Sequence, residues 1–387
     1  MRPAIGDQVF KLQAGQLRGV LGSEYRESSC SNGDARNFHI DPRDRRLTGR
    51  VHIEPNVFLR EGRRVRYGVT DNYGDFPAGT FVTSPPGHAP ARSGSDGKVR
   101  SKLRMITSAG STEELFAINI HGFFAGGGMY WQESRVLAEG LGWRLVAPSL
   151  PGFGGSDPLP WAKVDIYELA NEIAALMDHL GVGRALLLGH SMGGAVAVAF
   201  AQQYPERTLG IVYRDGAATP AWRHRTGLLV NAVKPLAPDI AGILDLGLGL
   251  AADLPDLLVG RRRADTLKRL IPDFRRNVRS IGRTIPVGAM LFTIDMTGDV
   301  AELGSQGKIP LLPVWGCFDK VANPSTAEEF EEASSRKVMW VPGGHSWMLA
   351  RPTAQLDVLV RTARGRAFVG QVLARQAELG EAQSKSP

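Results

Sequence analysis

Ser191 stands in a Gly-x-Ser-x-Gly pattern within the run ALLLGHSMGG, residues 185–194. An apolar segment of strand character precedes the pattern, and a segment of small residues typical of a tightly packed helix, AVAVAFAQQY, follows it. Glycines at 189 and 193 remove Cβ atoms that would collide with a neighbouring strand or helix, so a serine between them can occupy strained backbone and project its oxygen from the sheet edge. The pattern therefore predicts that Ser191 is a nucleophile.

A serine hydroxyl is a weak nucleophile and needs a general base, normally a histidine oriented by a carboxylate. Where serine stands on such a turn, the acid and then the histidine come later in the chain. Of the eight histidines, only His224 and His345 follow Ser191. His224 lies in the arginine-rich run WRHRTG and is expected to be solvated, whereas His345 ends the glycine-bearing run VPGGH after the last expected strand. We predict that His345 is the base and that His190, adjacent to Ser191, does not reach the hydroxyl.

Two aspartates stand at strand ends and are candidates for the acid. Asp319 follows PVWGCF, in the turn after the strand that immediately precedes the histidine strand, and Asp215 follows LGIVYR one strand earlier. The position of Asp319 favours it as the acid. Asp215 is the alternative.

The reaction of a serine with a carbonyl needs fixed hydrogen-bond donors for the developing oxyanion, and backbone N–H groups supply them without reorganisation. One donor is expected from Met192, at the start of the following helix, where the helix dipole also favours negative charge. The other is expected from the loop HGFFAGGG, at Phe123, with Phe124 as the alternative. A phosphate-cradling loop is disfavoured because the sequence lacks G-x-x-x-x-G-K-[ST].

The elements that must position these residues alternate between strand and helix patterns. This alternation predicts right-handed crossovers and a mostly parallel sheet with helices on both faces. Between Asp215 and about Thr297 the alternation stops and the periodicity is helical, which indicates an insertion. The predicted boundaries are an N-terminal extension of unknown role at 1–50, a core at 51–216 and 299–376, a helical cap at 217–298, and a polar, frayed tail at 377–387.

Five motifs occur in the order and approximate spacing of the α/β-hydrolase superfamily: HGFFAGG, PSLPGFGGSDP, GHSMGG, WGCFDKVANP and GGHSWML. The resemblance covers about residues 57–374. It implies an α/β-hydrolase fold with an eight-stranded, mostly parallel sheet and a helical cap inserted after the sixth strand. The chain resembles the capped branch of esterases, lipases and C–C hydrolases, since haloalkane dehalogenases and epoxide hydrolases carry aspartate where this chain has Ser191.

The expected activity is hydrolysis of a carboxylic ester with an apolar acyl or alkyl part, through an acyl-enzyme. The apolar stretch at 240–258 is a candidate pocket lining, although such a stripe more often forms a cap's own core. Phe124, Trp222, Phe292 and Met296 are further lining candidates. The same catalytic residues would also serve a C–C (diketone), thioester or amide hydrolase. A non-catalytic ligand receptor on this fold is the alternative from another class.

Composition limits the partners and the compartment. The net charge of +7 comes with no aromatic-interleaved basic motif, so no nucleic-acid partner is expected, and the basic runs predict solvated faces. The absence of a signal-peptide pattern and of an unbroken membrane span, together with two cysteines far apart in sequence, favours a cytoplasmic protein without an integral membrane segment. No cofactor is expected and no metal-ligand spacing occurs. The sequence gives no indication of oligomeric state.

Overall fold

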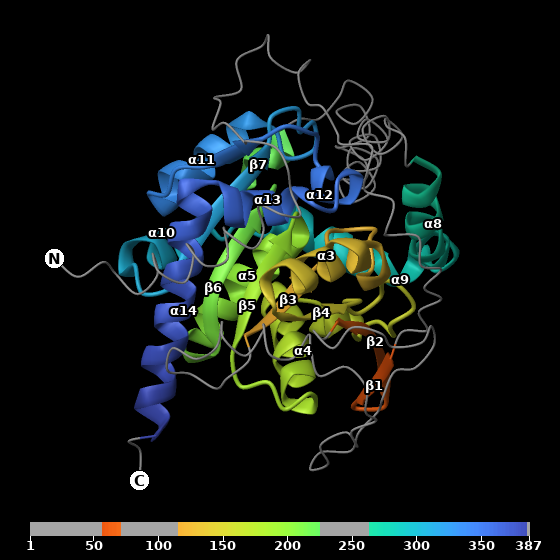
Figure 1. Cartoon of the computed structure of the whole chain (residues 1–387). Coiled ribbons are helices and arrows are strands. Elements are labelled where there is room, and N and C mark those ends of the chain that lie inside the picture. The colour runs from red at the N-terminus through yellow and green to blue at the C-terminus, as the bar shows by residue number, and fades with distance from the viewer. Residues whose placement is uncertain (1–55, 71–114, 225–262, 385–387) are drawn as a thin grey trace, which may run out of the picture.

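A central sheet organises the computed structural model, which describes residues 56–70, 115–224 and 263–384 (Figure 1). Its eight strands lie in the order β1-β2-β4-β3-β5-β6-β7-β8. The strands are β1 (Asn56–Arg60), β2 (Arg63–Thr70), β3 (Phe116–Ile120), β4 (Arg144–Pro148), β5 (Ala185–His190), β6 (Thr208–Arg214), β7 (Leu311–Gly316) and β8 (Met339–Val341). The fold is the α/β-hydrolase fold that the sequence predicts.

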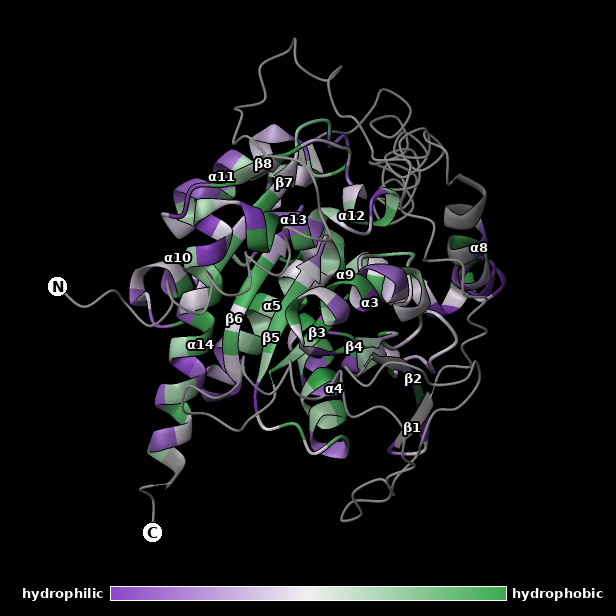
Figure 2. Ribbon diagram, viewed as in Figure 1, coloured by the Kyte–Doolittle hydropathy of each residue, from purple (hydrophilic) through white to green (hydrophobic). Residues whose placement is uncertain are grey.

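Only the N-terminal edge of the sheet is antiparallel. β1 and β2 form a hairpin whose turn, Glu61 and Gly62, has positive φ at both residues, and β2 pairs antiparallel with β4. From β4 to β8 all neighbouring strands are parallel. β5 and β6 are buried along their whole length, and Figure 2 shows hydrophobic residues along much of both strands. Strands covered on both faces in this way bring their carboxyl ends to one edge, where ligands bind in open α/β sheets.

Helices cover both faces of the sheet. One core cluster joins the sheet to α4 (Ile166–His179), α5 (Met192–Gln203), α10 (Thr297–Gln306) and α11 (Pro324–Ser334). The other joins it to α3 (Trp131–Leu141), α12 (Trp347–Ala350), α13 (Ala354–Arg361) and α14 (Ala363–Ser384). The 3-10 helices are η1 (Gly127–Tyr130), η2 (Trp161–Lys163), η3 (Pro205–Arg207) and η4 (Pro220–His224).

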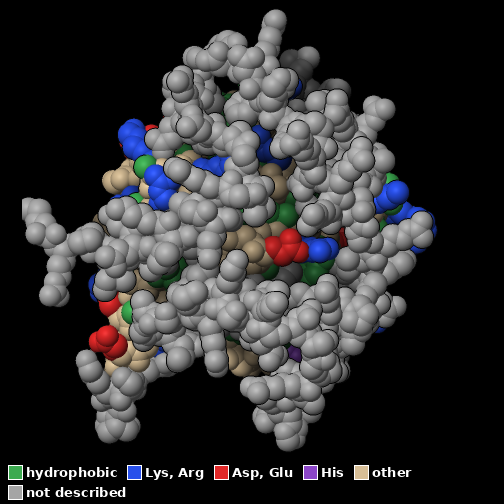
Figure 3. All heavy atoms as spheres, in the orientation of Figure 1, with side chains coloured by type: hydrophobic (Ala, Val, Ile, Leu, Met, Phe, Trp, Pro, Cys, Tyr) green, Lys and Arg blue, Asp and Glu red, His purple; other side chains and the backbone are tan. Residues whose placement is uncertain are grey.

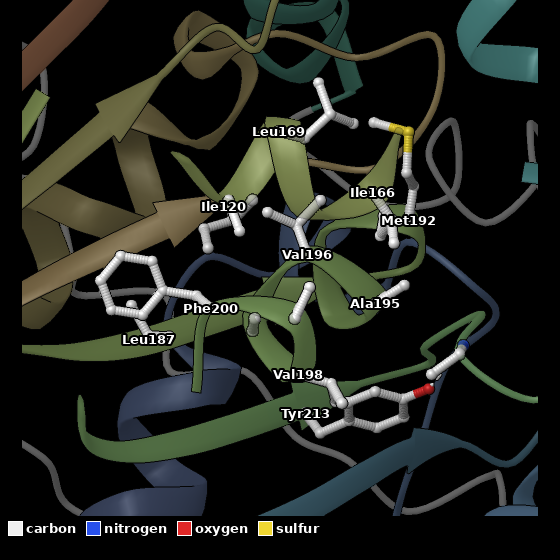
Figure 4. Packing of buried hydrophobic residues seen from close by; sticks show 14 of the residues in the cluster. Ile120, Ile166, Leu169, Leu187, Met192, Ala195, Val196, Val198, Phe200 and Tyr213 are labelled. Carbon is white, nitrogen blue, oxygen red and sulfur yellow. Dashed lines mark hydrogen bonds between the residues drawn. The ribbon is translucent and has the colours of Figure 1, made fainter. Parts of the chain in front are cut away.

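Helix α5 lies at the centre of the first cluster. Its residues 192–201 are all buried, and most of them are small, so the helix packs closely against β5 on one side and α4 on the other. Figure 4 shows Met192, Val196 and Phe200 of this helix among side chains from the strands and from α4. This packing fixes the start of α5, and therefore Ser191 directly before it.

The predicted cap, 217–298, is described at residues 217–224 and from Arg263 onward. Helices α8 (Arg263–Arg279) and α9 (Ile281–Thr293) confirm the helical periodicity there, whereas the apolar stretch at 240–258 and the N-terminal extension lie outside the described residues. Basic side chains gather over α8 (Figure 3), and Lys268, Arg275 and Arg279 are exposed, as predicted for a solvated face. Among the helices that the structure describes, none is long and apolar enough to cross a membrane.

The C-terminal end differs from the expectation of a polar, frayed tail. Helix α14 continues through that segment to Ser384. Arg184 donates a hydrogen bond from Nη2 to the Leu379 carbonyl (2.7 Å), and the Leu379 side chain packs against the second core cluster. These contacts across the fold hold a segment whose own sequence is polar.

Candidate active site

Ser191 occupies the sharp turn between β5 and α5. Its backbone lies at φ +54° and ψ −120°, a conformation that a residue with a side chain rarely adopts. The Ser191 N–H donates to the Arg214 carbonyl (2.9 Å), and the Ser191 carbonyl accepts from the N–H groups of Gly194 and Ala217. Hydrogen bonds on both sides of the residue therefore hold the strained turn.

The glycines around Ser191 are required by close contacts. A Cβ on Gly189 would lie 2.5 Å from the Gly193 carbonyl oxygen, and a Cβ on Gly193 would lie 2.2 Å from the oxygen of Ile120. Gly122, in the loop after β3, faces the serine itself, since a Cβ there would lie 3.0 Å from the Ser191 Cβ. The loop after β3 and the elbow are thus in contact, as an oxyanion site requires.

His345 and Asp319 meet at the carboxyl ends of β7 and β8. His345 Nδ1 lies 2.9 Å from Asp319 Oδ2, and both side chains are buried. The other carboxylate oxygen, Oδ1, accepts from the N–H groups of Val321 (2.7 Å) and Ala322 (2.9 Å). The Asp319 carboxylate, as an acceptor at Nδ1, favours the tautomer with the imidazole proton on Nδ1, in which Nε2 carries the lone pair that a base needs.

Asp215 lies beside this pair but is bound differently. Its Oδ1 accepts from the Gly316 N–H (2.7 Å) and its Oδ2 from the Trp347 indole N–H (2.6 Å). Complete burial and then the charge of Asp319 raise its pKa well above the usual value. Of the two candidate acids, Asp319 is the one that hydrogen-bonds His345.

The side chains of Asp215, Asp319 and His345 lie close enough together for their ligand atoms to share a cation. All four carboxylate oxygens, however, already accept hydrogen bonds: two from Gly316 and Trp347, and two from the loop N–H groups and the imidazole. This donor set therefore fits a hydrogen-bonded acid–base pair better than a metal centre.

Two buried N–H groups are available near Ser191. Neither the Phe123 N–H nor the Met192 N–H donates to an acceptor among the described residues, although both residues are buried. Buried backbone donors are rarely left unpaired, so we expect a ligand to supply the acceptor for this pair beside the strained serine. The two residues are those predicted for the oxyanion hole.

His121 fixes the peptide that carries the Phe123 N–H. The Leu150 N–H donates to His121 Nε2 (2.8 Å), so the proton of the neutral ring lies on Nδ1, which donates to the Gly122 carbonyl (2.7 Å). Complete burial lowers the pKa of His121 to about 4, so the ring remains neutral at neutral pH. Because the Gly122 carbonyl and the Phe123 N–H belong to one peptide unit, this bond orients the donor.

Asn277 of α8 joins the predicted cap to the same loop. Its Nδ2 donates to the carbonyls of Phe124 (2.8 Å) and Ala125 (2.9 Å), and its Oδ1 accepts from the Gly154 N–H (2.8 Å). Phe124 itself has φ +60°. Asn277 therefore holds a strained loop residue directly after Phe123.

The glycines of the same loop let α8 approach. A Cβ on Gly126 or on Gly128 would lie 2.7 Å from Asp273 Oδ2. Asp273 is buried and pairs with Arg276 on the same helix (2.7 Å). Packing of α8 thus accounts for Gly126 and Gly128, whereas a Cβ on Gly127 would lie 2.2 Å from the Ala147 carbonyl oxygen of β4.

The expected lining residues lie in two groups. Trp222 and Phe292 contact each other, with ring centroids 4.9 Å apart, and the Met296 N–H donates to the Ala218 carbonyl near the start of the cap segment. Phe124, in the loop after β3, has its ring centroid 5.3 Å from that of Phe123 and 6.3 Å from that of Phe274. Trp222 is buried, and its indole N–H has no hydrogen-bond partner among the residues that the structure describes.

A buried ion pair supports the elbow from the opposite face of the sheet. Arg214 donates from Nη1 to Glu133 Oε1 (2.5 Å) and from Nη2 to Asn119 Oδ1 (2.7 Å) and the Leu188 carbonyl (2.9 Å). Arg214 and Glu133 are essentially inaccessible to solvent. The side chain therefore ties the end of β6, whose carbonyl binds the Ser191 N–H, to β3, β5 and α3.

Sequence reasoning did not identify His121, Asn277 or Arg214 as parts of the site. Their partners lie up to about 150 residues away in the chain, so no local pattern marks them. His121 carried the clearest signal, since it directly precedes the glycine of the predicted oxyanion loop.

Residues 118–352, more than half of the chain, match the family described as alpha/beta hydrolase fold. The chain belongs to this family. AB hydrolase superfamily protein YisY of Bacillus subtilis is 27% identical over 237 residues, 59% of this chain and 84% of YisY.

A second relative has a named substrate. The 2-hydroxy-6-oxononadienedioate/2-hydroxy-6-oxononatrienedioate hydrolase of Burkholderia vietnamiensis is 43% identical over 186 residues, 46% of this chain and 61% of that protein. Among solved structures, MGS-M2, an alpha/beta hydrolase enzyme from a deep-sea metagenome library, is similar with a TM-score of 0.54 at 15% identity, covering 81% of this chain and 97% of that one. The structural likeness supports the fold.

Proposed function

We propose that this hydrolase cleaves carboxylic esters with an apolar acyl or alkyl part through an acyl-enzyme on Ser191. His345 Nε2 accepts the serine proton as the hydroxyl attacks the carbonyl carbon, and Asp319 stabilises the resulting imidazolium. The oxyanion accepts hydrogen bonds from the N–H groups of Phe123 and Met192. His345 then protonates the leaving alkoxide, and a water activated by the same imidazole hydrolyses the acyl-enzyme.

The observation that carries this proposal is the His345–Asp319 hydrogen bond beside a strained, buried serine. The N–H groups of Phe123 and Met192, which have no acceptor among the described residues, add the donors that acyl transfer needs. Ser191→Ala should abolish turnover of short p-nitrophenyl esters while the melting temperature stays close to that of the parent. Unchanged turnover in the alanine variant would show that the nucleophile assignment is wrong.

The apolar character of the substrate is supported by Phe124, Trp222, Phe292 and Met296. They are aromatic and thioether side chains, and Trp222 packs against Phe292 as Phe124 packs against Phe123. An ester chain-length series should show kcat/KM rising with acyl length and then reaching a plateau. Phe292→Ala should shift the optimum toward longer chains, and a flat series would remove the support for an apolar acyl site.

Hydrolysis of a C–C bond in a diketone is the second candidate, because the Burkholderia relative is named for an oxo-dienedioate substrate. The same three residues would serve it, as they would a thioester or an amide. Kinetics on an ester, a thioester, an anilide and a vinylogous 1,5-diketone, measured side by side, separate these possibilities. A kcat/KM for the diketone at least 100-fold above the best ester would replace the ester assignment.

The cytoplasmic location is also a proposal. It rests on the cysteine usage of the sequence, since two cysteines far apart in the chain are typical of a reducing compartment. Cell fractionation of the tagged protein, with the redox state of Cys317 measured by alkylation, tests the location.

A further inference from the structure

His190 has no part in the proposed proton transfer, yet it is buried at the centre of the site. It directly precedes Ser191, and its ring lies 4.7 Å from that of His345, at an angle of 46°. Nδ1 lies 2.5 Å from the Tyr130 hydroxyl, and Nε2 lies 2.8 Å from the backbone carbonyl oxygen of His345. One side chain thus connects η1 to the loop that carries the general base.

The protons of this connection have one consistent arrangement. A carbonyl oxygen only accepts, so His190 Nε2 must carry the hydrogen that it donates to His345. In the neutral ring Nδ1 is then an acceptor, and it receives the hydrogen of the Tyr130 hydroxyl. The Tyr130 oxygen in turn accepts from the Gly122 N–H at 3.4 Å.

The surroundings keep His190 in this neutral form. Tyr130 of η1, Arg214 of β6, His121 after β3 and His345 after β8 are the ionisable groups around it. Burial, followed by the charges of His345 and Arg214, lowers the pKa of His190 well below its usual value. The same burial raises the pKa of Tyr130, which stays a donor.

The connection crosses three segments that the proposed mechanism needs in fixed relation. Gly122 begins the loop with the Phe123 donor, His190 precedes the nucleophile, and His345 is the base. Geometry of this kind matters because a displacement of about 1 Å in a catalytic group costs roughly 100-fold in rate. A backbone bond to the base itself restrains its position independently of the bond to Asp319.

We propose that Tyr130 and His190 form a directional hydrogen-bond relay that positions the His345 backbone against the Ser191 elbow and the oxyanion loop. His190 is a positioning residue within the catalytic arrangement, and this role rests on the proposed function. The relay acts through the Nε2–H group of His190. A different side chain at 190 that donates the same hydrogen bond should therefore hold the His345 backbone in the same position.

Three variants and their combination test the relay. His190→Phe fills the space without the donor and should lower kcat for a p-nitrophenyl ester about 10- to 100-fold, with KM within about threefold. Tyr130→Phe removes the hydroxyl that donates to His190 Nδ1, so the His190 proton is no longer fixed on Nε2. This variant should lower kcat by a smaller factor, about 3- to 10-fold. In the His190→Phe background Tyr130→Phe should have no further effect. His190→Gln, whose amide can donate from Nε2 and accept at Oε1, should recover at least a third of the parent kcat.

The pH profile distinguishes positioning from general damage. Because His190→Phe loosens the base, the acidic-limb pKa of kcat/KM should shift, whereas a merely structural role would leave it in place. The proposal is overturned if folded His190→Phe keeps parental kcat and pH profile, if the two single losses multiply in the double variant, or if folded His190→Gln is as impaired as His190→Phe. If His190→Phe does not fold, Tyr130→Phe and His190→Gln test the relay. Parental kcat in Tyr130→Phe, or less than a third of the parent kcat in folded His190→Gln, would overturn the proposal. Failure of the proposed function itself would appear separately, as parental turnover in Ser191→Ala.

Discussion

Replacing Asp319 with asparagine should invert the tautomer of His345. In the parent protein Oδ1 accepts from the N–H groups of Val321 and Ala322, and Oδ2 accepts from His345 Nδ1. An amide has one oxygen, and the two loop N–H groups can be satisfied only if that oxygen stays at the Oδ1 position. The amide nitrogen must then face His345 Nδ1, which becomes an acceptor, so the imidazole proton moves to Nε2 and the ring cannot deprotonate Ser191.

The expected loss follows from this geometry. A base in the wrong tautomer, with the rest of the site intact, costs roughly 10⁴-fold in kcat. Asp215→Asn provides the contrast, because Asp215 bonds Gly316 and Trp347 rather than the imidazole. This variant should have a lower melting temperature than the parent. Its kcat should fall only about tenfold or less.

Steady-state hydrolysis of p-nitrophenyl butyrate measures both variants, and circular dichroism confirms that each is folded. The matched control is Asp178→Asn, which changes a surface carboxylate paired with Arg207 and should leave kcat unchanged. The reasoning is refuted if Asp319→Asn retains more than about a tenth of the parent kcat, or if folded Asp215→Asn loses as much kcat as Asp319→Asn.

Three further predictions concern the supports of the site. Asn277→Leu removes the bonds to Phe124, Ala125 and Gly154 at similar volume and should lower kcat about tenfold with little change in KM; an effect on KM alone would contradict a role in holding the oxyanion loop. Glu133→Ala leaves the Arg214 charge buried and unpaired and should reduce the unfolding free energy by about 3–5 kcal/mol in urea titrations, whereas a change below about 1 kcal/mol would contradict it. Because the folded-state pKa of His121 is about 4, below the unfolded value of about 6.5, its stabilising contribution is complete above pH 6.5 and is lost toward pH 4, by up to about 3 kcal/mol. His121→Gln should flatten part of that slope, and an unchanged slope would contradict it.

The sequence predicted the features that arise from local patterns. Alternating strands and helices indicated the parallel sheet, and two glycines around Ser191 indicated the elbow, because each depends on residues that are neighbours in the chain. The preference for Asp319 over Asp215 came from strand order, and the structure supplies the hydrogen bond to His345 that order alone could not give.

The remaining parts depend on contacts between distant segments. Asn277 meets Phe124 across about 150 residues, and His190 meets the His345 backbone across 155, so neither role is visible in a local window. Helix α14 shows the same limit. Its polar sequence suggested a frayed tail, but Arg184 and the second core cluster hold it as a helix to Ser384.

Covalent labelling by a fluorophosphonate tests the central claim most directly, because the probe reacts with a serine that a histidine has activated. Peptide mass spectrometry of the folded protein should place one phosphonate on Ser191, with no adduct in Ser191→Ala and a rate at least 100-fold lower in Asp319→Asn. Folded protein that stays unlabelled, or that carries the label on another residue, would contradict the account and favour a ligand receptor on this fold.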